Sequence, residues 1–112
     1  MLIYKILLPS EWAELEAAGH FDGSPDDRSS GFIHCSTREQ VADTAARVFG
    51  QEPKLVVVAV DAEVLGGAVR WEEAPTRGDV FPHVYGSLPR TAVAAVHEIA
   101  GASAVDEVLP LE

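Results

Sequence analysis

The chain has 112 residues and a formal net charge of −10, because 18 Asp and Glu stand against 8 Lys and Arg. Proteins that bind nucleic acid over a large surface carry a basic patch, since neutralised phosphates supply most of the affinity. The few cations here are scattered, so a nucleic-acid partner is not expected. A small anionic ligand is still compatible with this charge, since one or two arginines and a helix N-terminus can hold it.

An apolar fraction of 47% and a charged fraction of 23% predict a single globular domain over residues 1–112. The one cysteine, Cys35, allows no internal disulfide and no multi-cysteine zinc site, which suits a reducing cytoplasm. The N-terminal apolar run contains Lys5, stops at Pro9 and has no basic segment before it, so neither a signal peptide nor a membrane span is expected.

The first segments of the chain predict a strand, a helix and a loop. Residues 2–7 are apolar and partly β-branched, which favours a strand. Ser10 is a good N-cap for a helix that ends at Gly19. Residues 19–31 are rich in Gly, Asp and Ser and predict a loop, long enough to be typical of ligand-facing loops.

A second strand and helix follow. Residues 31–34 predict a short strand, and Ser36 with Glu39 three positions later matches a capping box that begins a helix. Gly50 ends this helix. Residues 55–60 are continuously apolar, which predicts a central strand that is buried on both faces.

The second half of the chain predicts mostly strands. Residues 61–67 read as a turn with one helical turn, and residues 69–72 as a strand. Residues 80–85 are strand-like but contain Pro82, which favours an edge or a strand end. Residues 90–99 favour a further strand. The sequence therefore predicts an α+β fold with two early helices and a mixed or antiparallel sheet.

A histidine lies where the second strand meets the second helix. His34 is suited to general acid–base chemistry or ligand binding from a rigid strand end, although a core histidine with one hydrogen bond is the alternative. Ser36 is expected to cap the helix, where free N–H groups can also receive a phosphate. Cys35 alternates with His34 along the strand and is therefore expected to be a small core residue on the opposite face.

A second group of polar residues lies later in the chain. His83 and Tyr85 are two residues apart and share one face of an extended segment, which could hold a base, a ribose or an acid. Glu72, beside Trp71, is usually solvated in such a strand and matters only if it converges on the histidines. His34, His83 and Glu72 would then resemble a two-histidine, one-carboxylate metal site, but their spacing matches no metal motif.

Few other features indicate chemistry. Arg28 follows two aspartates in the predicted loop and could be the cation for an anionic ligand, although such charge runs are usually solvated. His20 and His97 are expected at the surface. The sequence contains no dinucleotide-binding glycine motif, no phosphate-binding P-loop and no nucleophile elbow, so these simple cofactor and triad readings are excluded.

Several segments, in order along nearly the whole chain, resemble the DUF952 family of small bacterial proteins. The most specific pair is F-I-H-C-S at residues 32–36 with F-P-H-V-Y-G at residues 81–86. Supporting matches are I-Y-K-I at 3–6, Trp12, Gln40-Val41, L-V-V-V-A-V-D at 55–61 and R-W-E at 70–72.

This resemblance implies a fold similar to that of the ADP-ribosyltransferases, a group that includes NAD-dependent ADP-ribosyltransferases and tRNA 2′-phosphotransferases. Residues 32–34 would then be a strand of the ligand site, and Tyr4 and Lys5 would lie on the first strand of the cleft. The cofactor that the resemblance implies is NAD.

The leading hypothesis is therefore a cleft for a nucleotide-like ligand in a transferase-like enzyme. His34 would bind or protonate the ligand, Ser36 and Thr37 would offer N–H donors to an anion, and His83 with Tyr85 would form the other wall. His83 or Glu72 would act as the base or would stabilise an oxocarbenium ion. The alternative is a non-catalytic module that binds a metabolite or a protein partner, and the sequence does not indicate an oligomeric state.

Overall fold

The computed structural model describes residues 1–111, and its main sheet has three antiparallel strands. These are β1 (Leu2–Leu7), β4 (Leu55–Asp61) and β8 (Val93–Ile99), with β4 in the middle. Residues 55–60 of β4 are all buried, as the continuous apolar run predicted. The predicted central strand is therefore confirmed.

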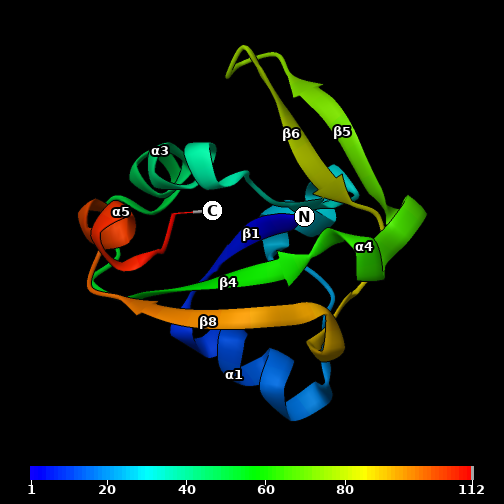
Figure 1. Cartoon of the computed structure of the whole chain (residues 1–112), viewed down its shortest axis with the longest axis horizontal. Coiled ribbons are helices and arrows are strands. Elements are labelled where there is room, and N and C mark those ends of the chain that lie inside the picture. Colours follow the sequence, from blue (N-terminus) through cyan, green and yellow to red (C-terminus); the bar gives the residue numbers. More distant parts are fainter. Residues whose placement is uncertain (112) are drawn as a thin grey trace.

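The two faces of this sheet pack into separate hydrophobic cores. Val56, Val58 and Val60 lie in one core with Leu15 of α1 (Pro9–Ala18). The alternate residues of β4 lie in the other core, which is covered by α3 (Arg38–Phe49) and α5 (Val105–Val108). Figure 1 shows α1 on one side of the sheet and α3 with α5 on the other. Both faces of β4 are thus covered, which requires its apolar run.

A second antiparallel sheet carries His34 and His83. It has the order β3 (Ile33–His34), β6 (Asp79–Val84) and β5 (Val69–Ala74). The β5–β6 hairpin projects away from the rest of the molecule (Figure 1). The remaining short elements are β2 (His20–Phe21) paired with β7 (Leu88–Pro89), α2 (Pro25–Ser30), α4 (Ala62–Leu65) and 3₁₀ turns at Gly66–Ala68, Arg90–Ala92 and Ala102–Ala104.

One backbone bridge joins the two sheets. Tyr4 of β1 and Ser36 exchange two hydrogen bonds, each 2.8 Å from nitrogen to oxygen. Because His34 lies two residues before Ser36, this bridge fixes the end of β3 against β1. The structure thus confirms a small α+β domain with antiparallel sheets and several helices.

The prediction of a continuous loop over residues 19–31 was wrong. This segment contains β2 and the helix α2, which begins with a capping box between Ser24 and Asp27 and has Pro25 at its first position. Gly31 ends the helix with a φ of 88°. Gly, Asp and Ser are common both in loops and at helix ends, so composition alone concealed this short helix.

Both predicted N-caps were one or two residues away from the real ones. The first helix begins at Pro9, with Glu11 accepting a hydrogen bond from the Leu8 N–H at 2.9 Å. The second begins after Thr37, whose hydroxyl accepts from the Gln40 N–H. Ser36 cannot take the cap position, because its backbone is already paired with β1.

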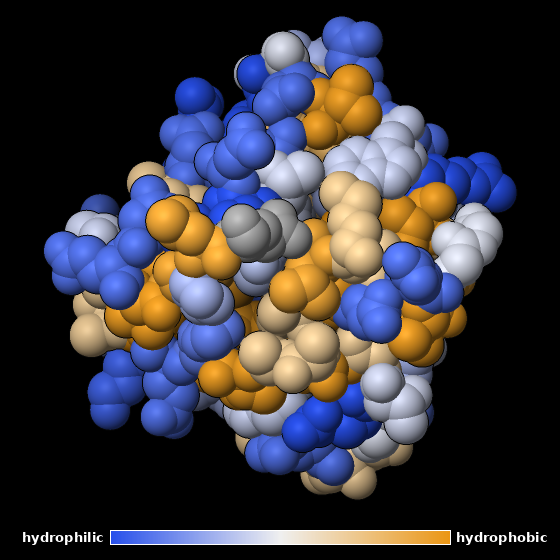
Figure 2. All heavy atoms as spheres, viewed as in Figure 1, coloured by the Kyte–Doolittle hydropathy of each residue, from blue (hydrophilic) through white to orange (hydrophobic). Residues whose placement is uncertain are grey.

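The surface mixes apolar and charged groups. Figure 2 shows hydrophobic residues towards the middle of one face, surrounded by hydrophilic ones. The large apolar side chains that are exposed come from several elements and include Val48, Val64, Trp71, Val80 and Val108. None of the helices in the described part of the chain is long and apolar enough to span a bilayer.

A buried ion pair attaches α2 to β1. Lys5 Nζ lies 2.9 Å and 3.2 Å from the two carboxylate oxygens of Asp27, and the two side chains are 6% and 2% exposed. The ammonium also donates to the carbonyl oxygen of His34 at 3.0 Å. Asp27 in turn accepts backbone hydrogen bonds from Ser24 and His34. The ion pair therefore holds β1, α2 and β3 together.

The first prediction concerns Gly31, the left-handed residue between α2 and β3. Neither Gly31 nor Gly67 has an atom within 4 Å of an added Cβ, and only Gly31 has a positive φ. Gly31→Ala should lower the free energy of unfolding by about 1 kcal/mol through backbone strain alone. Gly67→Ala is the matched control and should stay within about 0.5 kcal/mol. Urea unfolding of both variants checks this, and equal midpoints would contradict it.

The second prediction concerns Asp27. Burial alone would raise its pKa, but the hydrogen bond from His34, the charge of Lys5 and two backbone N–H groups hold the pKa well below the ordinary 3.8. The resulting stabilisation is complete above that ordinary value and is lost as the pH falls below it. Asp27→Asn should lower the free energy of unfolding at pH 7 by about 3 kcal/mol, because Lys5 is left buried without its counterion.

The control for Asp27→Asn is Asp26→Asn, since the neighbouring Asp26 side chain is 82% exposed. This variant should change the free energy of unfolding by less than about 0.5 kcal/mol. Denaturant unfolding at several pH values below about 4 should also show a flatter acid response for Asp27→Asn than for the wild type. Equal stability of the two variants would show that the ion pair does not organise the fold.

Candidate functional site

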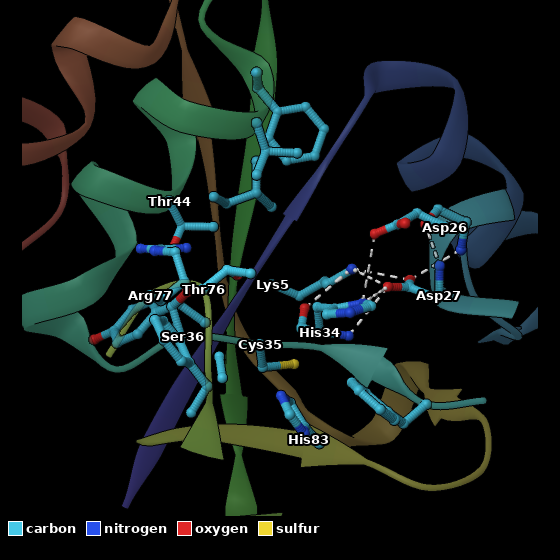
Figure 3. Close-up of a pocket in the computed structure, with 18 of the residues that line it drawn as sticks. Lys5, Asp26, Asp27, His34, Cys35, Ser36, Thr44, Thr76, Arg77 and His83 are labelled. Atoms are coloured by element: carbon cyan, nitrogen blue, oxygen red, sulfur yellow. Dashed lines mark hydrogen bonds and ion pairs between the residues drawn. The ribbon is translucent and has the colours of Figure 1, made fainter. Parts of the chain in front are cut away.

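A pocket of about 680 Å³ lies where β1, α2, β3 and α3 meet the β5–β6 hairpin. This volume is within the range of about 300–1,000 Å³ that small-molecule sites occupy. Figure 3 shows Lys5, Asp26, Asp27 and His34 on one side of the pocket and Thr44, Thr76 and Arg77 on another. The pocket is thus bounded by elements from both sheets.

His34 is held by the buried ion pair. Its Nδ1 lies 2.6 Å from Asp27 Oδ1, and Asp27 is ionised because its pKa is strongly lowered. A carboxylate accepts but does not donate, so Nδ1 carries a proton, and Nε2 is the nitrogen that can accept one whenever the ring is neutral. Within residues 1–111, Nε2 has no hydrogen-bond partner. His34 therefore presents an oriented, free basic nitrogen in the pocket wall.

His83 is held in the same manner by a different carboxylate. Its Nδ1 lies 2.8 Å from Glu72 Oε1, and the Tyr85 hydroxyl donates to the same oxygen at 2.7 Å. The hydrogen bonds from Tyr85 and His83 lower the pKa of Glu72. The hydrogen bond to Glu72, together with burial and the carboxylate charge, raises the pKa of Tyr85. The antiparallel pairing of β5 and β6 brings these groups together.

The two histidines are close neighbours. Their ring centroids are 5.8 Å apart, and His34 and His83 are directly paired across β3 and β6. Phe32 stacks on His83 with ring centroids 3.9 Å apart and also contacts His34. The pocket wall therefore contains two imidazoles, each fixed at Nδ1 by a carboxylate. Such a pair can work as a general base and a general acid when one ring is neutral and the other is protonated.

The structure brings five of the predicted site residues into this pocket, namely Tyr4, Lys5, His34, Ser36 and His83. Glu72 and Tyr85 do not line it and lie behind His83 instead. Arg28 is exposed and borders a separate, smaller hollow with Asp22 and Ser87.

The two N–H groups that were expected to hold an anion are already engaged. The Ser36 N–H donates to the Tyr4 carbonyl at 2.8 Å, and the Thr37 N–H donates to Gln40 Oε1 at 3.0 Å. Lys5, although in the pocket wall, is neutralised by Asp27. An anion in this pocket must therefore be held by other groups.

The sequence reasoning missed Asp27 and Arg77. Asp27 belongs to a charge run of a kind that is usually solvated, yet it is 2% exposed and contacts both Lys5 and His34. Its position three residues after Ser24, in a capping-box pattern, was the signal that could have found it. Arg77 lies in the turn of the hairpin, and no local pattern indicates that this turn reaches α3.

Neither the metal alternative nor a cysteine nucleophile finds support in the geometry. No group of three or more His, Cys, Asp or Glu side chains within residues 1–111 is arranged to hold a metal ion. His34 bonds to Asp27 whereas His83 bonds to Glu72, so the proposed triad is split between two carboxylates. Cys35 is a core residue, as predicted, and burial raises the pKa of its thiol to about 12. It is therefore protonated at neutral pH.

The chain matches one family model and solved structures of one bacterial protein. The model of the DUF952 family, described as a protein of unknown function, matches residues 6–96. The crystal structure of CC0527 from Caulobacter crescentus is 42% identical, with a TM-score of 0.83 over 88% of this chain and 86% of that chain.

The solution NMR structure of CC0527 from Caulobacter crescentus is 40% identical, with a TM-score of 0.79 over 99% of this chain and 98% of that chain. No curated protein matches the chain. Neither structure is described by an activity, a ligand or an ADP-ribosyltransferase name. Because the family model covers well over half of the residues, the chain belongs to the DUF952 family.

Proposed function

We propose that the protein is an acid–base enzyme of the transferase type that acts on a small nucleotide-like ligand in the pocket. The observation that supports this most is the pair of carboxylate-held imidazoles, His34 on Asp27 and His83 on Glu72, in one pocket wall. Carboxylate–imidazole pairs that face a pocket with one free nitrogen are typical of groups that move protons. The net charge of −10 favours a small substrate over a nucleic acid.

In this proposal each residue has one task. The neutral imidazole takes a proton at Nε2 from the attacking group, and the protonated imidazole gives one to the leaving group. Asp27 and Glu72 orient the rings and stabilise their charged forms, and both act through their histidines rather than on the ligand. Ser36 is buried and donates to Thr44, so its hydroxyl contributes through Thr44.

NAD is the ligand that the resemblance to ADP-ribosyltransferases implies, and when bound it would supply an ADP-ribosyl group for transfer. The donor set offers partners for its parts. Phe32 and Phe81 line the pocket and could stack on rings, and the carboxylate of Asp26 could face a cationic ring. These residues would hold the ligand, and one neutral imidazole would accept the proton of the attacking group. Nicotinamide would leave as a neutral molecule, so no proton would be needed on the leaving group, and the second histidine would position the ligand.

A non-catalytic binding module is the second candidate. It is favoured by the apolar part of the pocket wall, where Ile6, Leu8, Val48 and Phe49 form a surface without polar side-chain atoms. Such a wall would suit a metabolite, or an apolar side chain of a partner protein. Binding without turnover would identify this module and would replace the enzyme proposal.

The third prediction is a binding experiment on the wild-type protein. Titration of labelled protein with NAD, ADP-ribose and nicotinamide should give saturable amide shifts that include residues 31–37 and 81–86. These segments carry His34 and His83 and meet in the pocket. An NMR spectrum that stays unchanged at millimolar concentrations of all three ligands would overturn the nucleotide proposal.

The fourth prediction separates catalysis from binding. His34→Ala and His83→Ala should each reduce turnover of the bound ligand by about 10²- to 10⁴-fold. The amide spectrum of each variant should remain that of a folded protein. His20→Ala is the matched control, because His20 also pairs with an aspartate, Asp22 at 3.0 Å, but lies outside the pocket. Turnover assays on the three variants check this, and full activity in both pocket variants would contradict the assigned roles.

A further inference from the structure

One end of the pocket collects hydrogen-bond donors around Thr44. Ser36 Oγ donates to Thr44 Oγ1 at 3.0 Å, and an Arg77 terminal nitrogen donates to the same oxygen at 3.3 Å. An oxygen that accepts two hydrogen bonds has its own proton left to donate. Within the described part of the chain, no acceptor takes that proton. The Thr44 hydroxyl is therefore a free donor in the pocket wall.

Arg77 adds further donors beside it. One terminal nitrogen of its guanidinium contacts Asp43 at 2.9 Å as well as Thr44, whereas Nε and the other terminal nitrogen have no partner among residues 1–111. The guanidinium carbon lies 4.7 Å from the centroid of the Phe81 ring, which also lines the pocket. The group is thus held in place on a ring while several of its N–H donors remain unused.

The charge of Arg77 is also more available than that of the other pocket cation. Lys5 is paired with Asp27, which is only 2% exposed, so its charge is cancelled inside the protein. The partner of Arg77, Asp43, is 58% exposed and is shared with Arg47. An exposed carboxylate is screened by water and is easily displaced by a better-fitting anion. Arg77 can therefore bind an anion while losing little free energy from its ion pair with Asp43.

Carboxylates in the pocket wall oppose this attraction. Glu73 lies on the same hairpin, lines the pocket and is exposed. The buried aspartate, Asp27, lies on the other side of the pocket beside His34 (Figure 3). The α3 and hairpin end therefore carries the unused donors of Arg77 and Thr44 beside Glu73, whereas the α2 end carries Asp26 and Asp27.

We infer that the donor cluster of Arg77 and Thr44 binds a phosphoryl group of the ligand. The unused N–H groups of Arg77 match two oxygens of a phosphate, and the Thr44 hydroxyl donates to a third. This inference deepens the proposed function and uses the same pocket, because it selects a phosphorylated nucleotide over a free nucleoside. A phosphate at Arg77 leaves the rest of the ligand to extend towards His34 and His83, which lie elsewhere in the pocket (Figure 3).

The test uses inorganic pyrophosphate, which carries the phosphoryl group without a base or ribose. Labelled wild-type protein is titrated at constant ionic strength, with sodium chloride as the reference salt. The amides of residues 44, 76 and 77 should shift saturably with pyrophosphate and not with chloride. A wild-type protein without saturable shifts at these positions would overturn the inference.

Matched variants show which group binds. Arg77→Gln should weaken pyrophosphate binding about tenfold or more, since it removes charge-assisted hydrogen bonds. Arg47→Gln is the control, because Arg47 bonds to the same Asp43 oxygen at 2.9 Å but does not line the pocket, and its affinity should match the wild type. Equal affinities of the two variants would overturn the inference.

Two further variants test whether the loss of binding in Arg77→Gln is a direct effect on the anion. Thr44→Val keeps the shape of the side chain, removes its hydroxyl and should weaken pyrophosphate binding severalfold. Glu73→Gln removes the opposing charge and should strengthen it. Unchanged affinity in both variants would place the anion elsewhere and overturn the inference.

The outcome is separate from that of the proposed function. If pyrophosphate binds as described but the histidine variants keep full turnover, the acid–base proposal fails and the phosphoryl site stands. If the histidine variants lose turnover while Arg77→Gln binds pyrophosphate like Arg47→Gln, the enzyme stands and this inference fails.

Discussion

The ion pair between Lys5 and Asp27 is the contact on which the site depends. A buried charge is tolerated only when it is paired and hydrogen-bonded, and Asp27 meets this requirement with Lys5, His34 and two backbone N–H groups. The same contacts join the first strand, the short helix α2 and the end of β3. Asp27, which orients the His34 ring, therefore also holds together the three elements that surround that ring.

The second histidine depends on sheet pairing rather than on a buried charge. The register of β5 and β6 places Glu72 diagonally across from His83, and Tyr85, the residue after β6, donates its hydroxyl to the same carboxylate. Direct pairing of His34 with His83 then brings the two carboxylate–imidazole pairs together. Two separate sets of contacts thus position the two histidines, and they meet at the paired strands β3 and β6.

The sequence revealed local features well and long-range ones poorly. The apolar run of β4, the shared face of His83 and Tyr85 and the core position of Cys35 all follow from local pattern. The burial of Asp27 does not, because it requires Lys5, which is 22 residues distant in the sequence. The family resemblance correctly indicated the DUF952 family, whereas the solved structures that match give no support to the ADP-ribosyltransferase-like fold that it implied.

The projecting β5–β6 hairpin has a consequence for how the protein can change. It supplies Glu73, Arg77 and Phe81 to the pocket, yet most side chains near its tip are outside both hydrophobic cores. Its contacts with α3 are polar, between Gln40 and Asp79 and between Arg77 and Asp43. Substitutions near the tip therefore change the stability of the two cores little. The hairpin side of the pocket can thus change its ligand preference while the two cores maintain the fold.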